Sequence, residues 1–123
     1  MDGTLTPSAL DGVELFAGLP LEEKARLAAE LKTVPLRRGD VLVRQDEPAD
    51  TLFIVVSGRF AVTVRGRRDA VAELGAGQPV GEIAFLAGGQ RTATVTALRD
   101  SLVLRLGREE FEKLSQRSPA IWR

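Results

Sequence analysis

A glycine, a carboxylate and an arginine are spaced to suit a ligand that carries a sugar hydroxyl and a phosphate. Gly81 lets the backbone approach a ligand closely, because it has no β-carbon. Glu82 can accept a hydrogen bond from a hydroxyl, and Arg91, further along the chain, can fork onto a phosphate. Free N–H groups in the turn after Gly81 would also favour an anion. The pattern predicts a sugar-phosphate site over residues 80–95.

The residue types that are missing exclude most catalytic sites. The 123 residues include no histidine and no cysteine, which removes the commonest general base, thiolate nucleophiles, disulfides and the commonest metal ligands. The carboxylate pairs Glu22-Glu23 and Glu109-Glu110 fall at expected helix starts, where they complement the helix dipole. We therefore predict a binding domain without catalytic residues or a metal, and not an enzyme.

Size and charge set further limits. The chain is short enough for one domain, 1–123, and its 17 basic and 17 acidic residues cancel, which argues against direct nucleic-acid binding. No apolar run approaches the roughly 20 residues of a membrane span. The N-terminus lacks the features of a signal peptide. We expect a cytoplasmic location with no membrane span in this segment.

Helices are expected before the strands, over the N-terminal segment of residues 1–33. Thr6-Pro7 is a start signal for a short helix that ends at Gly18. A second helix is expected from Pro20, with an apolar stripe that we expect to pack in the core. The stripe comprises Leu21, Ala25, Leu27, Ala28 and Leu31.

From residue 34 to residue 106, short β-type runs alternate with turn residues, which is typical of a sandwich or barrel. The nearly all-apolar run 52–56 is predicted to be a central strand, whereas Gly75, Gly77 and Pro79 are expected to break the ladder. About eight short strands favour an antiparallel jelly roll, a mainly β fold with flanking α-helices. The runs identified are 34–36, 41–43, 52–56, 60–64, 70–74, 92–98 and 101–106.

The C-terminal segment, residues 107–123, has a helical pattern. A helix is predicted over 108–114, with Phe111 and Leu114 on one face. Ser118-Pro119 then repeats the helix start signal, but the sequence stops four residues later. We interpret this as a truncated helical end, so that the chain is a piece of something longer.

The segment 80–95 resembles the phosphate-binding cassette of cyclic nucleotide-binding domains: Gly-Glu-aliphatic-Ala, a short loop, then Arg-small-Ala-Thr-Val. The sequences at 15–19, 36–40 and 52–58 resemble the same family, which includes the catabolite activator protein and the regulatory subunit of protein kinase A. The resemblance covers about 15–114. It implies an eight-stranded jelly roll with N-terminal helices, an inserted cassette helix and C-terminal helices.

The resemblance also implies roles for single residues. Glu82 would accept a hydrogen bond from the ribose 2′-hydroxyl, and Arg91 would pair with the cyclic phosphate. Inward-facing valines are core residues by default, but two of them match positions that pack against the purine in relatives. The implied ligand-binding residues are Gly81, Glu82, Ile83, Ala84, Arg91, Thr92, Ala93, Val62 and Val64.

Three features depart from the family pattern. Gln90 stands where relatives often have proline, so the loop before Arg91 could be looser. Asp46 stands where glycine is usual, and aspartate tolerates the left-handed region moderately well. The lid helix that caps the base in relatives is missing.

The resemblance implies a regulatory sensor that binds cAMP or cGMP and needs no cofactor. We favour cAMP, although Thr92 could contact a guanine. Binding would be transmitted through the C-terminal helices to an effector outside this chain, for example a patatin-like phospholipase, and a homodimer is a possible assembly. The alternatives are a module that kept the fold but lost the ligand, and a cupin-like metalloenzyme, which the absence of histidine disfavours.

Overall fold

The computed structural model of the protein describes residues 20–117, apart from the side chains of residues 27, 30 and 113–117. The expected first helix, the 15–19 motif and the helix start at Ser118 lie outside these residues. Within them, eight strands and three helices follow one another along the chain.

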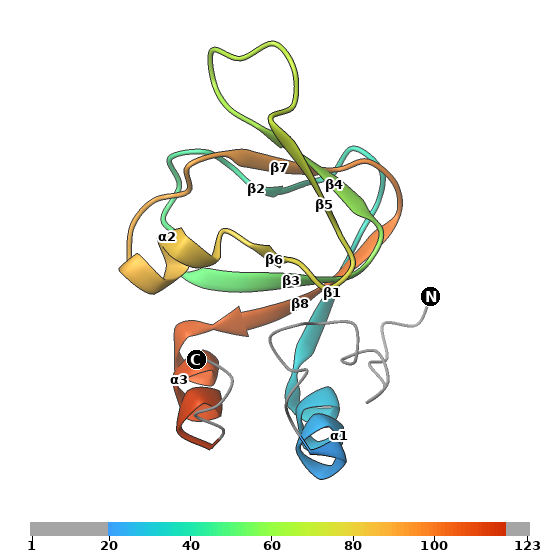
Figure 1. The fold of residues 1–123 in the computed structure, drawn as a ribbon, viewed down its shortest axis with the longest axis vertical. Coiled ribbons are helices and arrows are strands. Elements are labelled where there is room, and N and C mark those ends of the chain that lie inside the picture. The colour runs from blue at the N-terminus through green and yellow to red at the C-terminus, as the bar shows by residue number, and fades with distance from the viewer. Residues whose placement is uncertain (1–19, 118–123) are drawn as a thin grey trace.

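The strands form two four-stranded antiparallel sheets, stacked one above the other in Figure 1. The first sheet has the order β1 (Lys32–Leu36), β8 (Ser101–Gly107), β3 (Thr51–Ser57) and β6 (Pro79–Val80). The second has the order β2 (Val41–Val43), β7 (Thr94–Ala97), β4 (Arg59–Thr63) and β5 (Ala72–Gly75). The prediction of an antiparallel, mainly β jelly roll is confirmed, and β3 is a central strand as expected.

The main core lies between the two sheets. Phe60 of β4 pairs with Ala97 of β7, and Val55 of β3 pairs with Val103 of β8, so apolar side chains from both sheets meet. This arrangement follows from strand geometry, because alternate side chains point to one face. The buried members are Leu36, Val43, Val55, Phe60, Val80, Val95, Ala97 and Val103.

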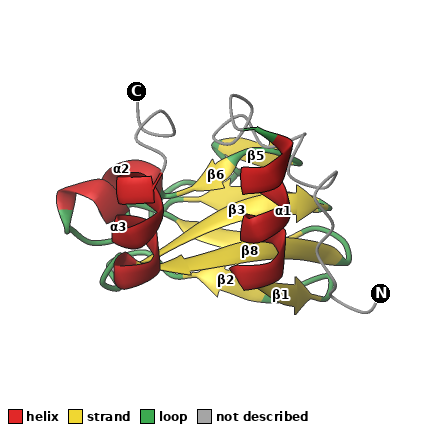
Figure 2. Ribbon diagram, turned by 90° about the horizontal axis from the view of Figure 1, so that it is seen from below, coloured by secondary structure: helices red, strands yellow, loops and turns green. Residues whose placement is uncertain are grey.

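The outer face of the first sheet is buried as well. Leu102, Leu104 and Leu106 alternate with Val103 along β8, so they face away from the inter-sheet core, yet all three are buried. Figures 1 and 2 place α1 (Leu21–Glu30) and α3 (Arg108–Arg117) over this face. Two covered faces explain why β8 is apolar along most of its length.

Two expectations about these elements were wrong. Gly75 and Pro79 do not break the ladder. Gly75 pairs with Arg59 as the last residue of β5. Pro79 pairs with Ile54 as part of β6, which is tolerated because β6 is an edge strand. The stripe of α1 is only partly buried: Ala28 is buried, whereas Ala25 is exposed and Leu21 is 74% exposed. Helical spacing shows which residues share a face, but not how far the neighbouring layer extends beneath it.

The remaining element ends differ by a few residues from the expected ones. The run 92–98 is a strand only over β7, because residues 91–93 form an irregular bend in front of it. The run 60–64 ends as a strand at Thr63, so Val64 lies just beyond β4. The helix that starts at Arg108 continues to Arg117.

Candidate functional site

The predicted cassette forms a short helix, α2 (Glu82–Ala87), between β6 and β7. Gly81 precedes it in the left-handed region, with φ 67°, a conformation that glycine adopts without a steric penalty. The helix is anchored by Phe85, which is fully buried, whereas Ile83 on the opposite side is 80% exposed. Main-chain bonds from Gly88 N to Phe85 O and from Gly89 N to Ala84 O close its last turn.

Arg91 lies directly beside the start of this helix. Its side chain is buried, with only 4% exposed. The guanidinium donates to the carbonyl oxygen of Thr51 and lies 3.5 Å, Nη1 to O, from the carbonyl of Gly81. A β-carbon on Gly81 would come within 2.5 Å of Arg91 Nη1. A larger residue here would have to displace the Arg91 side chain and adopt a left-handed conformation, so both features favour glycine.

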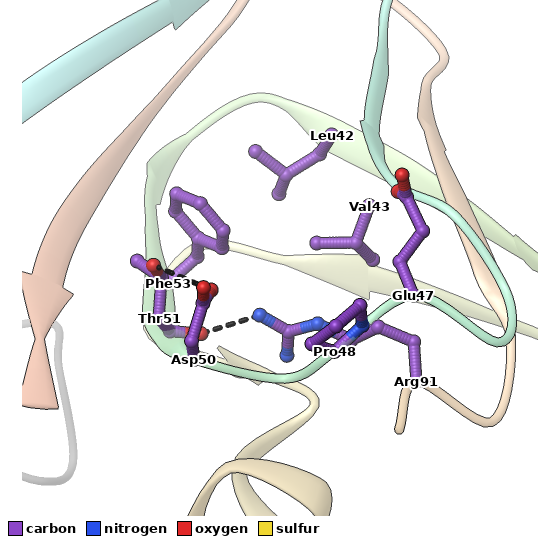
Figure 3. Close-up of a pocket in the computed structure, with 8 residues that line it drawn as sticks. All are labelled: Leu42, Val43, Glu47, Pro48, Asp50, Thr51, Phe53 and Arg91. Carbon is purple, nitrogen blue, oxygen red and sulfur yellow. Dashed lines mark hydrogen bonds between the residues drawn. The ribbon is translucent and has the colours of Figure 1, made fainter. Parts of the chain in front are cut away.

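The surroundings of Arg91 combine apolar and acidic groups. Burial lowers the pKa of the Arg91 guanidinium, and the charges of Asp50 and Glu47 oppose that shift. The ring of Phe53 lies 5.9 Å from the guanidinium carbon. Figure 3 shows the guanidinium extended toward Thr51 and Asp50 across a cavity of about 290 Å³. Arginine keeps its charge in such a setting, so the site holds a buried cation.

The residues before Arg91 pair with the loop that precedes β3. Asp46 N donates to Arg91 O and Arg91 N to Glu47 O, both at 2.8 Å, and Ala49 N donates to Gly89 O at 3.0 Å. Gln90 forms the intervening bridge with Pro48. These bonds hold residues 89–91 although Gln90 replaces the usual proline, so the main chain is not left unsupported there.

The second departure from the family pattern is also accommodated. Asp46 adopts a φ of 74°, the left-handed region in which glycine is usual. Its carboxylate forms an ion pair with Arg65, 2.5 Å from Oδ2 to Nη2, at the start of the β4–β5 turn. Aspartate is among the residues that tolerate this region, as expected.

A larger cavity of about 550 Å³ lies against α2. Gln90 and Thr92 line this cavity, whereas Arg91, which lies between them in sequence, lines the smaller one. The larger cavity is lined by Pro79, Gly81, Glu82, Ile83, Ala84, Ala87, Gly89, Gln90 and Thr92.

The structure therefore brings together six of the nine predicted ligand-binding residues: Gly81, Glu82, Ile83, Ala84 and Thr92 line the larger cavity, and Arg91 touches Gly81. Ala93, Val62 and Val64 line neither cavity. Val62 instead packs against the inter-sheet core, as its strand position favoured.

Sequence reasoning missed the partners of Arg91. Its partners lie some 40 positions earlier in the chain and come close to it only when the sheet has formed. They are Thr51, Asp50 and Glu47. The available signal was the polar loop over residues 45–50, directly before the central strand.

The start of α3 packs onto the cassette helix. The guanidinium of Arg108 lies 4.3 Å from the ring centroid of Phe85 and donates to the Phe85 carbonyl. The ring of Phe111 meets Phe85 edge-on, with 5.2 Å between centroids. The cassette helix is thus in contact with the C-terminal helix as well as with the sheet.

The described stretch of the chain holds neither a metal-binding cluster nor a membrane-spanning helix. Residues 20–117 contain no group of three or more acidic side chains placed to hold a metal ion. No helix in this range is long and apolar enough to cross a membrane.

The fold and the site define a class: an antiparallel β-roll with a glycine-led helical cassette and a buried arginine beside it. The chain belongs to the cyclic nucleotide-binding domain family, whose sequence model matches residues 33–118. This family is regulatory, and its fold is a binding fold and not a catalytic one.

Individual relatives agree with this assignment. An uncharacterized NTE family protein of Mycobacterium tuberculosis is 34% identical over 119 residues, which are 97% of this chain but 20% of that protein. The chain thus spans a fifth of that relative's length. The catabolite activator protein of Thermus thermophilus has a TM-score of 0.78 at 30% identity, with 87% of this chain and 52% of that one covered.

The regulatory domain of Toxoplasma gondii protein kinase A, solved with cAMP, has a TM-score of 0.74 at 30% identity. The match covers 88% of this chain and 43% of that one.

Proposed function

We propose that this chain is a sensor domain that binds a cyclic nucleotide, cAMP in preference to cGMP, in the larger cavity against α2. The observation that carries the proposal is the contact between Gly81 and Arg91, which sets a buried guanidinium at the head of the cassette. Arg91 lines the smaller cavity, but it contacts Gly81 in the wall of the larger one, and a charged donor at this position favours an anionic group. Similar domains solved with cAMP support the choice of nucleotide.

The remaining residues take roles that follow from their position. Glu82, half-buried in the cavity wall, accepts a hydrogen bond from the ribose 2′-hydroxyl. Ile83, Ala84, Thr92 and Ala93 supply main-chain N–H groups near the phosphate. Val62 lies on β4 of the second sheet and Val64 just beyond the end of this strand, and both would approach the base when the ligand fills the roll.

Binding is transmitted through α3 to an effector domain. The support is the contact of Arg108 and Phe111 with Phe85, because any shift of α2 on binding must change the packing of α3. A ligand moves such an equilibrium only by its different affinity for the two arrangements. The match covers only 20% of the NTE family protein, and the rest of that polypeptide is long enough to hold an effector domain, which supports an effector in the same polypeptide here.

The ribose contact gives a sharp test. Calorimetric titration should show that Glu82→Gln weakens binding of cAMP but leaves binding of 2′-deoxy-cAMP unchanged, since the deoxy ligand lacks the hydroxyl that Glu82 accepts from. Glu109→Gln, an exposed carboxylate on α3, is the matched control.

Equal losses of affinity for cAMP and 2′-deoxy-cAMP would show that Glu82 does not contact the ribose 2′-hydroxyl. If the wild-type chain gives neither heat nor a thermal shift with millimolar cAMP or cGMP, the sensor function is wrong, and a ligand-free interaction module is the better description.

A further inference from the structure

Gln90 is one of the residues that line the larger cavity, and its carboxamide is not held by the protein. In the part of the chain that the structure describes, no hydrogen bond joins its side chain to another residue, and the residue is exposed. Its main chain, in contrast, is fixed by the bridge to Pro48 and by the bonds that flank it. A fixed backbone therefore carries a free amide at the wall of the cavity.

Hydrogen-bond donors are scarce in the wall of this cavity. The lining consists of apolar residues and glycines apart from three polar side chains, Glu82, Gln90 and Thr92. Glu82 can only accept when it is ionised, so Gln90 and Thr92 are the side chains that can donate to an anion. Arg91, which lies between them in sequence, lines the other cavity and has two guanidinium nitrogens directed at main-chain carbonyls.

We propose that the side-chain N–H of Gln90 donates a hydrogen bond to the phosphate of the bound nucleotide. The proposal rests on the function proposed above and assigns Gln90, which replaces the usual proline, a direct role in ligand binding. The amide is adjacent in the chain to the arginine at the head of the cassette, and phosphate oxygens accept such bonds strongly.

The test uses the full chain and calorimetric titration with cAMP and with cGMP. Gln90→Met keeps the length of the side chain and removes its hydrogen bonding, so both nucleotides should bind roughly tenfold more weakly, as expected for a lost bond to a charged group. Gln90→Glu should weaken binding further, because it brings a negative charge to the phosphate. Arg67→Met, an exposed residue that lines neither cavity, should bind as the wild type does.

Gln90→Pro provides a second variant with the family's usual residue. The Gln90 N–H donates to no main-chain carbonyl in the described residues, so proline fits the bridge, and the variant should fold and bind like Gln90→Met. Unchanged midpoints of unfolding for the ligand-free variants are expected, since the side chain has no protein partner there.

Wild-type affinity in Gln90→Met for both nucleotides would overturn the proposal. A loss confined to one of them would also overturn it, because it would place the amide on the base and not on the shared phosphate. A wild-type chain that binds neither nucleotide would overturn the sensor function itself, and this inference with it.

Discussion

Replacing Arg91 by methionine should destabilise the protein in the absence of any ligand. The substitution removes the partly buried hydrogen bond to the Thr51 carbonyl, and a hydrogen bond that involves a charged group contributes about 1.5–3 kcal/mol. The 3.5 Å approach to the Gly81 carbonyl is at the limit of a hydrogen bond and adds little. Relief from burying a charge offsets some of the loss, so we expect a net change of about 2 kcal/mol.

This change is large enough to measure. For a chain of 123 residues, 1 kcal/mol corresponds to a shift in Tm of about 4 °C, so Arg91→Met should melt about 8 °C below the wild type. Urea unfolding of the ligand-free protein gives the free energy directly. Arg67→Met is the matched control, because an exposed arginine without a described side-chain partner should change stability by less than about 0.5 kcal/mol.

A ligand-free Arg91→Met protein with the wild-type midpoint would refute this reasoning. It would mean that the main-chain contacts of the guanidinium contribute nothing to the fold. If the loss is found, weaker nucleotide binding by Arg91 variants cannot be attributed to the phosphate alone. Binding should then be compared at a temperature well below the midpoint of each variant.

Two further substitutions test the backbone. Gly58→Ala should lower the free energy of unfolding, measured with urea, by about 3 kcal/mol or more. The reason is that Gly58 has φ 102° and that an added β-carbon would lie 1.9 Å from Ser101 Oγ. A loss below about 1 kcal/mol would contradict this. Asp46→Gly should change stability by less than about 1 kcal/mol, because relief of the left-handed conformation offsets the exposed ion pair with Arg65. A loss above about 2 kcal/mol would show that this pair holds the β4–β5 turn in place.

The strands and the cassette could be predicted from the sequence because their signals are local. Alternating apolar residues and turn residues locate β2, β3 and β4 within a residue or two, and Gly81 marks the start of α2. The burial of α1 could not be predicted in the same way. Leu21 and Ala28 share an apolar stripe, but only Ala28 is covered, because the extent of the layer beneath the helix depends on distant segments.

The same distinction applies to the candidate site. The sequence by itself determined which residues carry the chemistry: a glycine, a carboxylate and an arginine at a spacing that a helical cassette can use. Only the tertiary structure decided that Arg91 is buried against the carbonyl of Thr51, that Gln90 and Thr92 line the larger cavity against α2, and that Phe85 meets α3. The reason is physical: local spacing selects a conformation, whereas the contacts of a side chain depend on strands brought together from distant regions of the chain.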